Sequence, residues 1–260
     1  MRNAMIIIVL ALITSLAASP IAAGQILTIY TEHSPYAQYL DEDGQPKGYV
    51  YELVLEMQKI MQDSTPIHFV PWARGYQLAL TQPNTALFST TLTEERRPLF
   101  KWVGPVAETV WAFYAAKDSD IVIESLEDAK AVKRIGTYTG DVREAFLKEQ
   151  GFTNLDSAPD NDSNLRKLIA GRITLWITSP SMVQRMAGMG FPRDSVKKVY
   201  TVDRKELFIA FNKDTSDKIV EQWAQAYVQV SEDGTMQAIF DRWGEKVPFS
   251  VRPSFPPELD

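Results

Sequence analysis

The sequence contains no cysteine and only two histidines. The lack of cysteine excludes disulfides, thiolate metal sites, cysteine nucleophiles and a lipid attached to an N-terminal cysteine. His33 and His68 are not four residues apart on a helix, the spacing at which two histidines often bind zinc. We therefore expect neither a metal nor another cofactor.

Long hydrophobic runs are also missing after the first two dozen residues. The N-terminus combines the positive residue Arg2 with an apolar stretch, Ile6–Leu16, and small residues up to Gly24. This order is typical of a secretory signal peptide, and the stretch is shorter than the roughly 20 residues of a membrane-spanning helix. We predict a signal peptide over 1–23 and a mature protein in the periplasm, without a lipid anchor.

Positive charge is in the minority, because 27 lysines and arginines face 33 aspartates and glutamates, which gives a net charge of -6. An acidic chain argues against nucleic acid or an anionic membrane surface as the main partner. The roughly 236 residues after the signal peptide suffice for one large domain or two modest domains without disulfides.

Strand-like and helix-like patterns alternate along the chain. Short apolar runs predict strands, and apolar positions three and four residues apart predict amphipathic helices. The alternation predicts an α/β fold with mainly parallel sheets, in which ligands bind at the carboxyl ends of strands. The predicted strands are 26–30, 67–70, 86–88, 110–115, 132–136, 173–177 and 207–211. The predicted helices include 50–61, 74–80, a short one capped by Ser125, 141–150, 162–170, 216–230 and 234–243, and Asp41–Gly44 predicts a hairpin turn.

The segment 86–105 carries the clearest indication of a binding site. Its apolar strand is followed by the hydroxyl residues 89–91 and by 93–96, which predicts the start of a helix, with Thr91 and Glu94 spaced as a capping box. Hydroxyls donate hydrogen bonds, and an arginine grips a carboxylate through two parallel ones, so this segment can hold a small anion. The alternative is a capped helix with an arginine on its surface.

A series of distinct short motifs occurs in order along the chain. They are Thr31–Tyr36, Leu40–Gly48 with Tyr49 opening a helix, Pro71–Arg74, Ser89–Arg96, Gly104–Val106, Ala170–Ile173, and Glu232–Thr235 leading to Trp243. Their order and spacing over about 210 residues resemble the bacterial solute-binding proteins of family 3. These are type II periplasmic binding proteins and include receptors for polar amino acids.

The resemblance implies two α/β lobes, each with a mainly parallel sheet flanked by helices. Two crossing segments, placed near Ala107–Thr109 and Arg204–Glu206, would form a hinge that closes the lobes on a ligand. Lobe 1 would comprise 24–107 and 207–260, and lobe 2 would comprise 108–206. The resemblance also implies a monomer.

In amino-acid-binding relatives, the arginine at the position of Arg96 pairs with the carboxylate of the ligand. The resemblance therefore implies Arg96 as the anion clamp, with Thr91 and Ser89 as supporting donors. An aromatic residue covers the ligand in relatives, which implies Tyr36 or Trp72 here. Strand-end capping for the hydroxyls and core packing for the aromatics are the structural alternatives.

Three further residues belong to the predicted site. Glu32 stands where relatives often carry an acid that faces the cleft, Arg74 begins a helix and could add a second cation, and Tyr138 lies in a second-lobe loop that relatives use for the ligand. A solvated loop carboxylate and a surface charge are the alternatives for Glu32 and Arg74.

The chain departs from its relatives where they hold an ammonium group. Ser179 stands where receptors for α-amino acids usually carry an aspartate, and the familiar Gly-x-Ile-Asp pattern is missing. An unpaired ammonium in a closed cleft costs on the order of several kcal/mol, so we expect weaker binding of neutral α-amino acids than of other small carboxylates. Asp141 or Glu32 could replace the missing partner, or Asp141 could only N-cap its helix.

The resemblance thus implies a receptor without catalysis for a small polar solute that bears a carboxylate. Such a receptor would deliver its solute to an inner-membrane ABC permease or to a membrane sensor. Two alternatives stay open. The same fold hosts a dehydratase acting on cyclic acids, for which Glu32, Asp141 and His33 would be the candidate acids and bases. The chain could also be a receptor-like protein that serves for docking to another protein.

Overall fold

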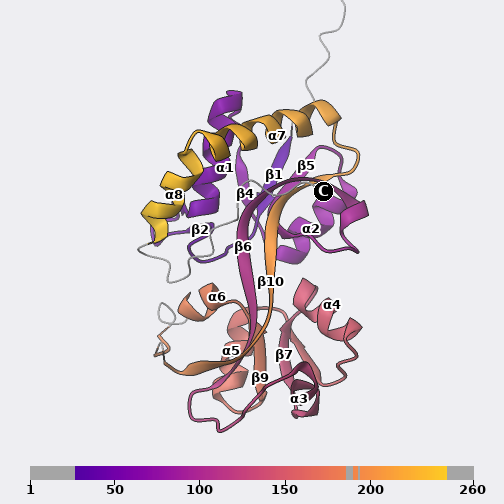
Figure 1. Ribbon diagram of the computed structural model, residues 1–260, viewed down its shortest axis with the longest axis vertical. Helices are drawn as coiled ribbons and strands as arrows, with labels where there is room; N and C mark the ends of the chain where they lie inside the picture. Colours follow the sequence, from indigo (N-terminus) through magenta and orange to yellow (C-terminus); the bar gives the residue numbers. More distant parts are fainter. Residues whose placement is uncertain (1–26, 186–189, 193, 245–260) are drawn as a thin grey trace, which may run out of the picture.

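The computed structural model describes residues 27–185, 190–192 and 194–244. The predicted signal peptide lies outside the described residues, and so does the end of predicted lobe 1 beyond Gly244. The described chain forms two α/β lobes, which two long strands connect (Figure 1). The predicted fold class is confirmed. Within the described ranges, no helix is long and apolar enough to cross a membrane.

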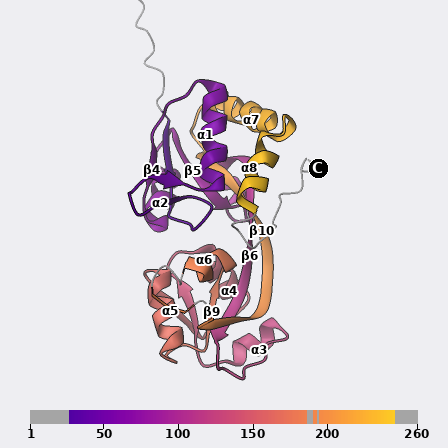
Figure 2. The same cartoon turned by 90° about the vertical axis from the view of Figure 1, so that its left-hand side faces the viewer.

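The upper lobe of Figure 1 is built around three parallel strands. β1 (Thr28–Thr31) lies between β4 (Ile67–Phe69) and β5 (Thr85–Thr91), and both pairings are parallel. The helices of this lobe are α1 (Tyr49–Met61), α2 (Trp72–Thr81), α7 (Asp217–Glu232) and α8 (Thr235–Gly244), seen from a second side in Figure 2.

Helix α1 shows how the apolar spacing builds the core. Its buried residues include Val50, Leu53, Val54 and Met57, which recur at three and four residues and so share one face. That face packs into the same core as Trp223, Ala226 and Val230 of α7. Each large apolar side chain buried in this way contributes about 1.5–3 kcal/mol to folding.

The predicted hairpin precedes α1. It pairs β2 (Tyr39–Leu40) with β3 (Pro46–Lys47), and the Asp41 carboxylate accepts hydrogen bonds from the backbone nitrogens of Asp43 and Gln45 at 3.0 and 2.8 Å. The turn prediction is confirmed.

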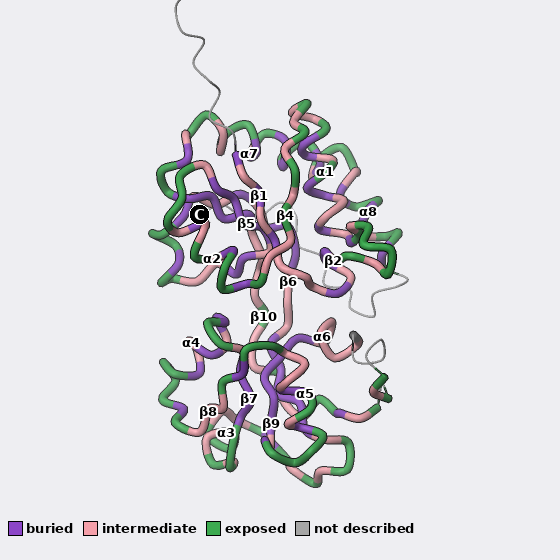
Figure 3. The backbone as a smooth tube through the Cα atoms, turned by 180° about the vertical axis from the view of Figure 1, so that it is seen from behind, coloured by how far each residue is buried: buried purple, intermediate pink, exposed green. Residues whose placement is uncertain are grey.

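The lower lobe repeats the parallel arrangement. β7 (Ile135–Tyr138) lies between β8 (Leu155–Ala158) and β9 (Leu175–Thr178), both parallel to it. Its helices are α3 (Leu126–Ala131), α4 (Val142–Glu149), α5 (Asn161–Ile169) and α6 (Pro180–Arg185). Ser125 caps α3 as predicted, by accepting from the backbone nitrogen of Asp128. Figure 3 shows buried segments along the strands of both lobes.

Two strands of 17 residues run through both lobes. β6 (Phe100–Ala116) and β10 (Val196–Asn212) pair antiparallel, and β10 also pairs with β5 while β6 pairs with β9. The two parallel sets are thereby joined in one hydrogen-bonded order, β4-β1-β5-β10-β6-β9-β7-β8. Between the lobes, Glu108 stands opposite Glu206 and Thr109 opposite Lys205. The two predicted crossing segments are therefore parts of β6 and β10. The residue bounds of the two lobes remain a prediction.

The segment after β5 differs from the prediction. β5 runs to Thr91, so the hydroxyl residues belong to the strand, and 93–96 forms a turn before a short 3-10 helix, η1 (Arg97–Leu99). The predicted α-helix with its capping box is wrong. Pro98 lacks the N–H that would continue a helical hydrogen-bond ladder. The Thr93 hydroxyl instead accepts from the backbone nitrogen of Arg96 at 3.3 Å.

Candidate functional site

A cleft between the lobes is lined by side chains from both lobes and from the two crossing strands. The cleft brings together eight of the residues predicted from the sequence: Glu32, Tyr36, Trp72, Ser89, Thr91 and Arg96 from the upper lobe, and Asp141 and Ser179 from the lower lobe.

Two predicted residues do not line this cleft. Arg74 is exposed on α2, so the structure does not support it as a second cation of the site. Tyr138 lines a neighbouring groove together with Glu32 and the start of α5, and its ring packs against the cluster around Trp72. Burial raises the pKa of Tyr138 to about 12, so this hydroxyl stays protonated at neutral pH.

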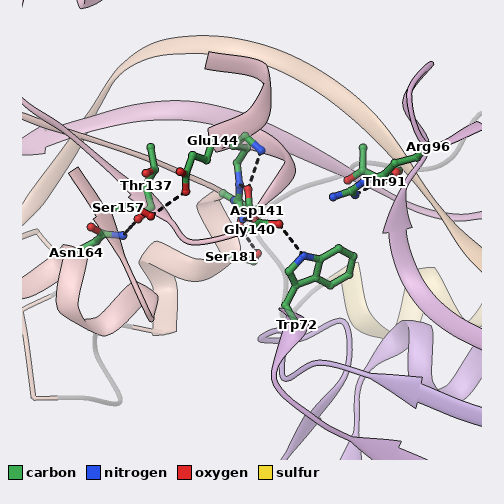
Figure 4. Close-up of polar contacts among 12 residues, drawn as sticks. Trp72, Thr91, Arg96, Thr137, Gly140, Asp141, Glu144, Ser157, Asn164 and Ser181 are labelled. Atoms are coloured by element: carbon green, nitrogen blue, oxygen red, sulfur yellow. Dashed lines mark hydrogen bonds and ion pairs between the residues drawn. The ribbon is translucent and has the colours of Figure 1, made fainter. Parts of the chain in front are cut away.

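The turn after β5 directs two consecutive arginines to different surroundings. Arg97 is exposed and forms an ion pair with Glu94 at 3.0 Å. Arg96 is only 7% exposed, and its Nη1 donates to the backbone carbonyl of Thr91 at 3.4 Å (Figure 4). Its guanidinium carbon lies 4.7 Å from the ring centre of Tyr76 and 5.3 Å from that of Trp72.

This surrounding holds Arg96 in place without neutralising it. Aromatic faces attract a cation by about 0.5–2 kcal/mol each, but no carboxylate among the described residues forms an ion pair with Arg96. Burial lowers the pKa of Arg96, but an arginine remains charged in proteins at all ordinary pH values. The cleft therefore presents a buried positive charge that Asp141 attracts from the other side but that forms no ion pair among the described residues.

Trp72 connects the two lobes beside Arg96. Its Nε1–H donates to the backbone carbonyl of Gly140, in the loop between β7 and α4, at 3.3 Å (Figure 4). The same indole stacks on Tyr76. Trp72 therefore contacts Arg96 in one lobe and the backbone of the other.

Asp141 is paired within its own lobe. Its carboxylate accepts from the backbone nitrogen of Arg143 at 2.8 Å, from Nε of Arg143 at 2.6 Å and from Nη2 at 2.7 Å. The interpretation of Asp141 as the N-cap of α4 is confirmed. Burial disfavours both charges, but the pairing outweighs it, so the pKa of Asp141 is lowered and that of Arg143 is raised.

Glu32 directly follows β1 and has no such partner. No hydrogen bond or ion pair engages its carboxyl among the described residues. Burial, reinforced by the negative charge of Asp141, raises the pKa of Glu32 to about 7, although Arg143 acts in the opposite direction. Near neutral pH this carboxyl is therefore divided between its neutral and ionised forms.

The end of β9 contributes a neutral group. Ser179 is buried, and its hydroxyl lies 3.0 Å from that of Ser181 at the start of α6. The two hydroxyls satisfy each other and carry no charge. The lower lobe thus presents serines and the Asp141–Arg143 pair to the cleft.

Ser89 contacts a residue that the sequence did not reveal as part of the site. The Ser89 hydroxyl donates to Oε1 of Gln38 at 2.9 Å, while Nε2 of the fully buried Gln38 has no partner among the described residues. Ser89 and Tyr36 also have positive φ angles, 61° and 65°, which are uncommon outside glycine. Such backbone strain is concentrated at binding sites.

Gln38 and Arg143 are the most informative lining residues missed in the sequence. Nothing in the pattern around Gln38 distinguishes it from an ordinary hairpin residue. The sequence did contain an indication for Arg143. It stands two residues after Asp141, the predicted N-cap, and so within reach of that carboxylate.

Comparison with known proteins supports this description of the fold. The model of the bacterial extracellular solute-binding proteins, family 3, matches residues 27–246. No curated protein sequence shows a significant match to the chain.

Several solved structures have the same fold. A histidine kinase sensor domain with similarity to periplasmic binding proteins has a TM-score of 0.74 at 17% identity, over 84% of this chain and 95% of that chain. An ancestral arginine-binding protein bound to arginine has a TM-score of 0.73 at 22% identity, over 84% and 97%. A putative L-cystine ABC transporter from Listeria monocytogenes has a TM-score of 0.68 at 21% identity, over 84% and 94%.

The match to the family model spans most of the chain, including both lobes and both crossing strands. The members of this family bind solutes, so the chain is a binding protein and not an enzyme. It belongs to the bacterial extracellular solute-binding proteins, family 3.

Proposed function

We propose that this protein is a periplasmic receptor that binds a small, amino-acid-like solute through its carboxylate. The observation that carries the proposal is the Arg96 guanidinium, which is buried, lies against two aromatic rings and has no ion-paired carboxylate in the part of the chain that the structure describes. A buried charge without a partner is unfavourable, and a ligand carboxylate would supply one through two parallel hydrogen bonds. Thr91, Trp72 and Tyr36 would surround that carboxylate.

The structural relatives support both the solute class and two routes downstream. One of them is an ancestral arginine-binding protein bound to arginine, one is a putative L-cystine ABC transporter, and one is a histidine kinase sensor domain. The receptor would therefore deliver its solute to an inner-membrane ABC permease or signal through a membrane sensor. The predicted signal peptide supports export to the periplasm, and we expect a monomer.

The two crossing strands support closure of the lobes as the response to ligand. The hinge would lie where Glu108 pairs with Glu206, with lobe 1 comprising 24–107 and 207–260 and lobe 2 comprising 108–206. Trp72 and the Gly140 carbonyl, which already meet across the lobes, would stabilise the closed form.

A thermal-shift screen over small carboxylates and amino acids tests the proposal. A ligand at 100 times its Kd stabilises the native state by about 2.7 kcal/mol, which is readily detected. Small-angle scattering with the ligand found should then show a smaller radius of gyration. A complete absence of stabilising ligands would favour the docking role instead, and an unchanged radius at saturation would contradict closure.

Ser89→Ala is expected to weaken ligand binding several-fold, because it removes the hydroxyl that orients Gln38. One neutral hydrogen bond contributes about 0.5–1.5 kcal/mol. Ser89→Gly is the matched variant, since it also lacks the hydroxyl but accepts the positive φ without strain. Calorimetry should show similar losses of affinity for both variants, with the alanine variant less stable. Wild-type affinity in Ser89→Ala would show that this hydroxyl has no role in the cleft.

A further inference from the structure

The cleft contains three acids that differ in their partners. Asp141 gives both carboxylate oxygens to Arg143. Glu108 lies on β6 at the hinge, opposite Glu206. Glu32 alone stands at the end of a strand of the upper lobe, with no ion pair or hydrogen bond to its carboxyl among the described residues. Glu108 also has no ion pair or hydrogen bond among the described residues, but it lies on the crossing strand. Glu32 is therefore the acid at the strand ends of the upper lobe that remains available to a ligand.

The topology places Glu32 near the proposed carboxylate clamp. β1 and β5 are neighbouring parallel strands, so their carboxyl ends meet at the same edge of the sheet. Glu32 immediately follows β1, and Arg96 follows β5 in the turn after Thr91. Both residues line the cleft. A ligand whose carboxylate pairs with Arg96 therefore lies in the same cleft as Glu32, at the same edge of the sheet.

Several charged or titratable groups face Glu32 from the elements around it. Asp141 and Arg143 act on it from the start of α4, and Tyr138 from the end of β7. The adjacent groove adds His33 beside it and Asp160 and Asp162 at the start of α5. Because the Asp141–Arg143 pair is internally neutral, these surroundings supply no net cation that would hold Glu32 ionised.

We propose that Glu32 is the specificity-determining acid of the cleft and that its proton decides which carboxylates bind. A ligand with an ammonium group binds with Glu32 ionised and releases the proton to the buffer. A carboxylate without an ammonium binds with Glu32 protonated and takes the proton up. This inference rests on the proposed function, since it requires a carboxylate at Arg96.

The protonation of Glu32 fixes the direction in which each affinity changes with pH. With a pKa of about 7 in the free protein, Glu32 is about nine-tenths protonated at pH 6 and about nine-tenths ionised at pH 8. Apparent affinity scales with the fraction in the competent form. From pH 6 to pH 8, affinity should therefore rise by up to about tenfold for an amino acid and fall by up to about tenfold for its deaminated analogue.

Calorimetry on the full mature chain tests this with matched pairs: L-glutamine with 4-carbamoylbutanoate, L-leucine with 4-methylpentanoate, and L-serine with 3-hydroxypropanoate. Each pair shares a carboxylate and a side chain and differs in the ammonium alone. Titrations at pH 6 and pH 8 give, for each member of a pair, the slope of its affinity against pH. Titrations at pH 7 in phosphate and in Tris give the protons released or taken up, which should differ in sign between the members of a pair.

Three variants assign the proton. Glu32→Gln should abolish the pH dependence of both affinities, whereas His33→Gln and Glu108→Gln, which change other ionisable side chains that line the cleft, should keep it. The number of protons released or taken up on binding is measured on the wild-type protein. It therefore tests the inference even if Glu32→Gln folds poorly. Equal slopes for both members of a pair, or slopes that persist in Glu32→Gln, would overturn the inference.

Failure of the inference is distinguishable from failure of the proposed function. If Arg96→Ala removes binding of every probe while the slopes are equal, the carboxylate clamp stands and the role of Glu32 is wrong. If no probe binds the wild-type protein, or if Arg96→Ala binds the probes normally, the proposed function is wrong and the inference falls with it.

Discussion

Arg96→Ala is expected to abolish binding of carboxylate ligands at concentrations that saturate the wild-type protein. Truncating one partner of a buried, hydrogen-bonded charge pair costs about 2–5 kcal/mol, which corresponds to roughly a 30-fold to several-thousand-fold loss of affinity. The fold should not suffer, because the variant removes a buried cation that forms no ion pair among the described residues.

Arg97→Ala is the matched control for this experiment. It removes an arginine from the same turn, but one that is exposed and paired with Glu94 at the surface. Isothermal calorimetry should show wild-type affinity for Arg97→Ala and no measurable binding for Arg96→Ala. A Kd in Arg96→Ala within a factor of two of wild type would remove Arg96 from the site.

Arg143→Ala is expected to lower the free energy of unfolding by about 3–5 kcal/mol, because it leaves the buried Asp141 carboxylate without its counter-ion. The two side chains are only 15% and 8% exposed, so water does not compensate for the loss. Urea unfolding measures the change.

A double variant separates the charge from the packing. In Asp141→Asn with Arg143→Ala, the asparagine still caps α4 and no charge remains buried, so much of the stability should return. Arg97→Ala, which breaks a surface pair, should cost at most about 1 kcal/mol. A loss below about 1 kcal/mol in Arg143→Ala would show that the ion pair is not formed in solution.

Apolar periodicity was sufficient to predict most of the helices and the buried strands. The sequence did not reveal β8 or the first half of β10, for a physical reason. Residues Leu155–Ala158 and Val196–Glu206 contain few apolar positions and are mostly exposed or half-buried. The long crossing strand is held by its backbone pairing with β6, and such pairing leaves no periodic trace in the sequence.

Some residues of the candidate site could likewise be predicted from the sequence, and others could not. Residues of one motif, such as Thr91 and Arg96, could be predicted to line the cleft, because the motif lies at the end of β5 and in the turn that follows. Residues whose role depends on a distant contact were not. Gln38 is defined by Ser89, 51 residues away, and the availability of Glu32 depends on the pairing of Asp141 with Arg143 in the other lobe.

A crystal structure with a carboxylate ligand found in the thermal-shift screen tests the central claim most directly. The account predicts a closed cleft, with both carboxylate oxygens of the ligand about 2.7–2.9 Å from the guanidinium nitrogens of Arg96. A ligand whose carboxylate lies elsewhere, with Arg96 facing an apolar part of it or solvent, would contradict the account.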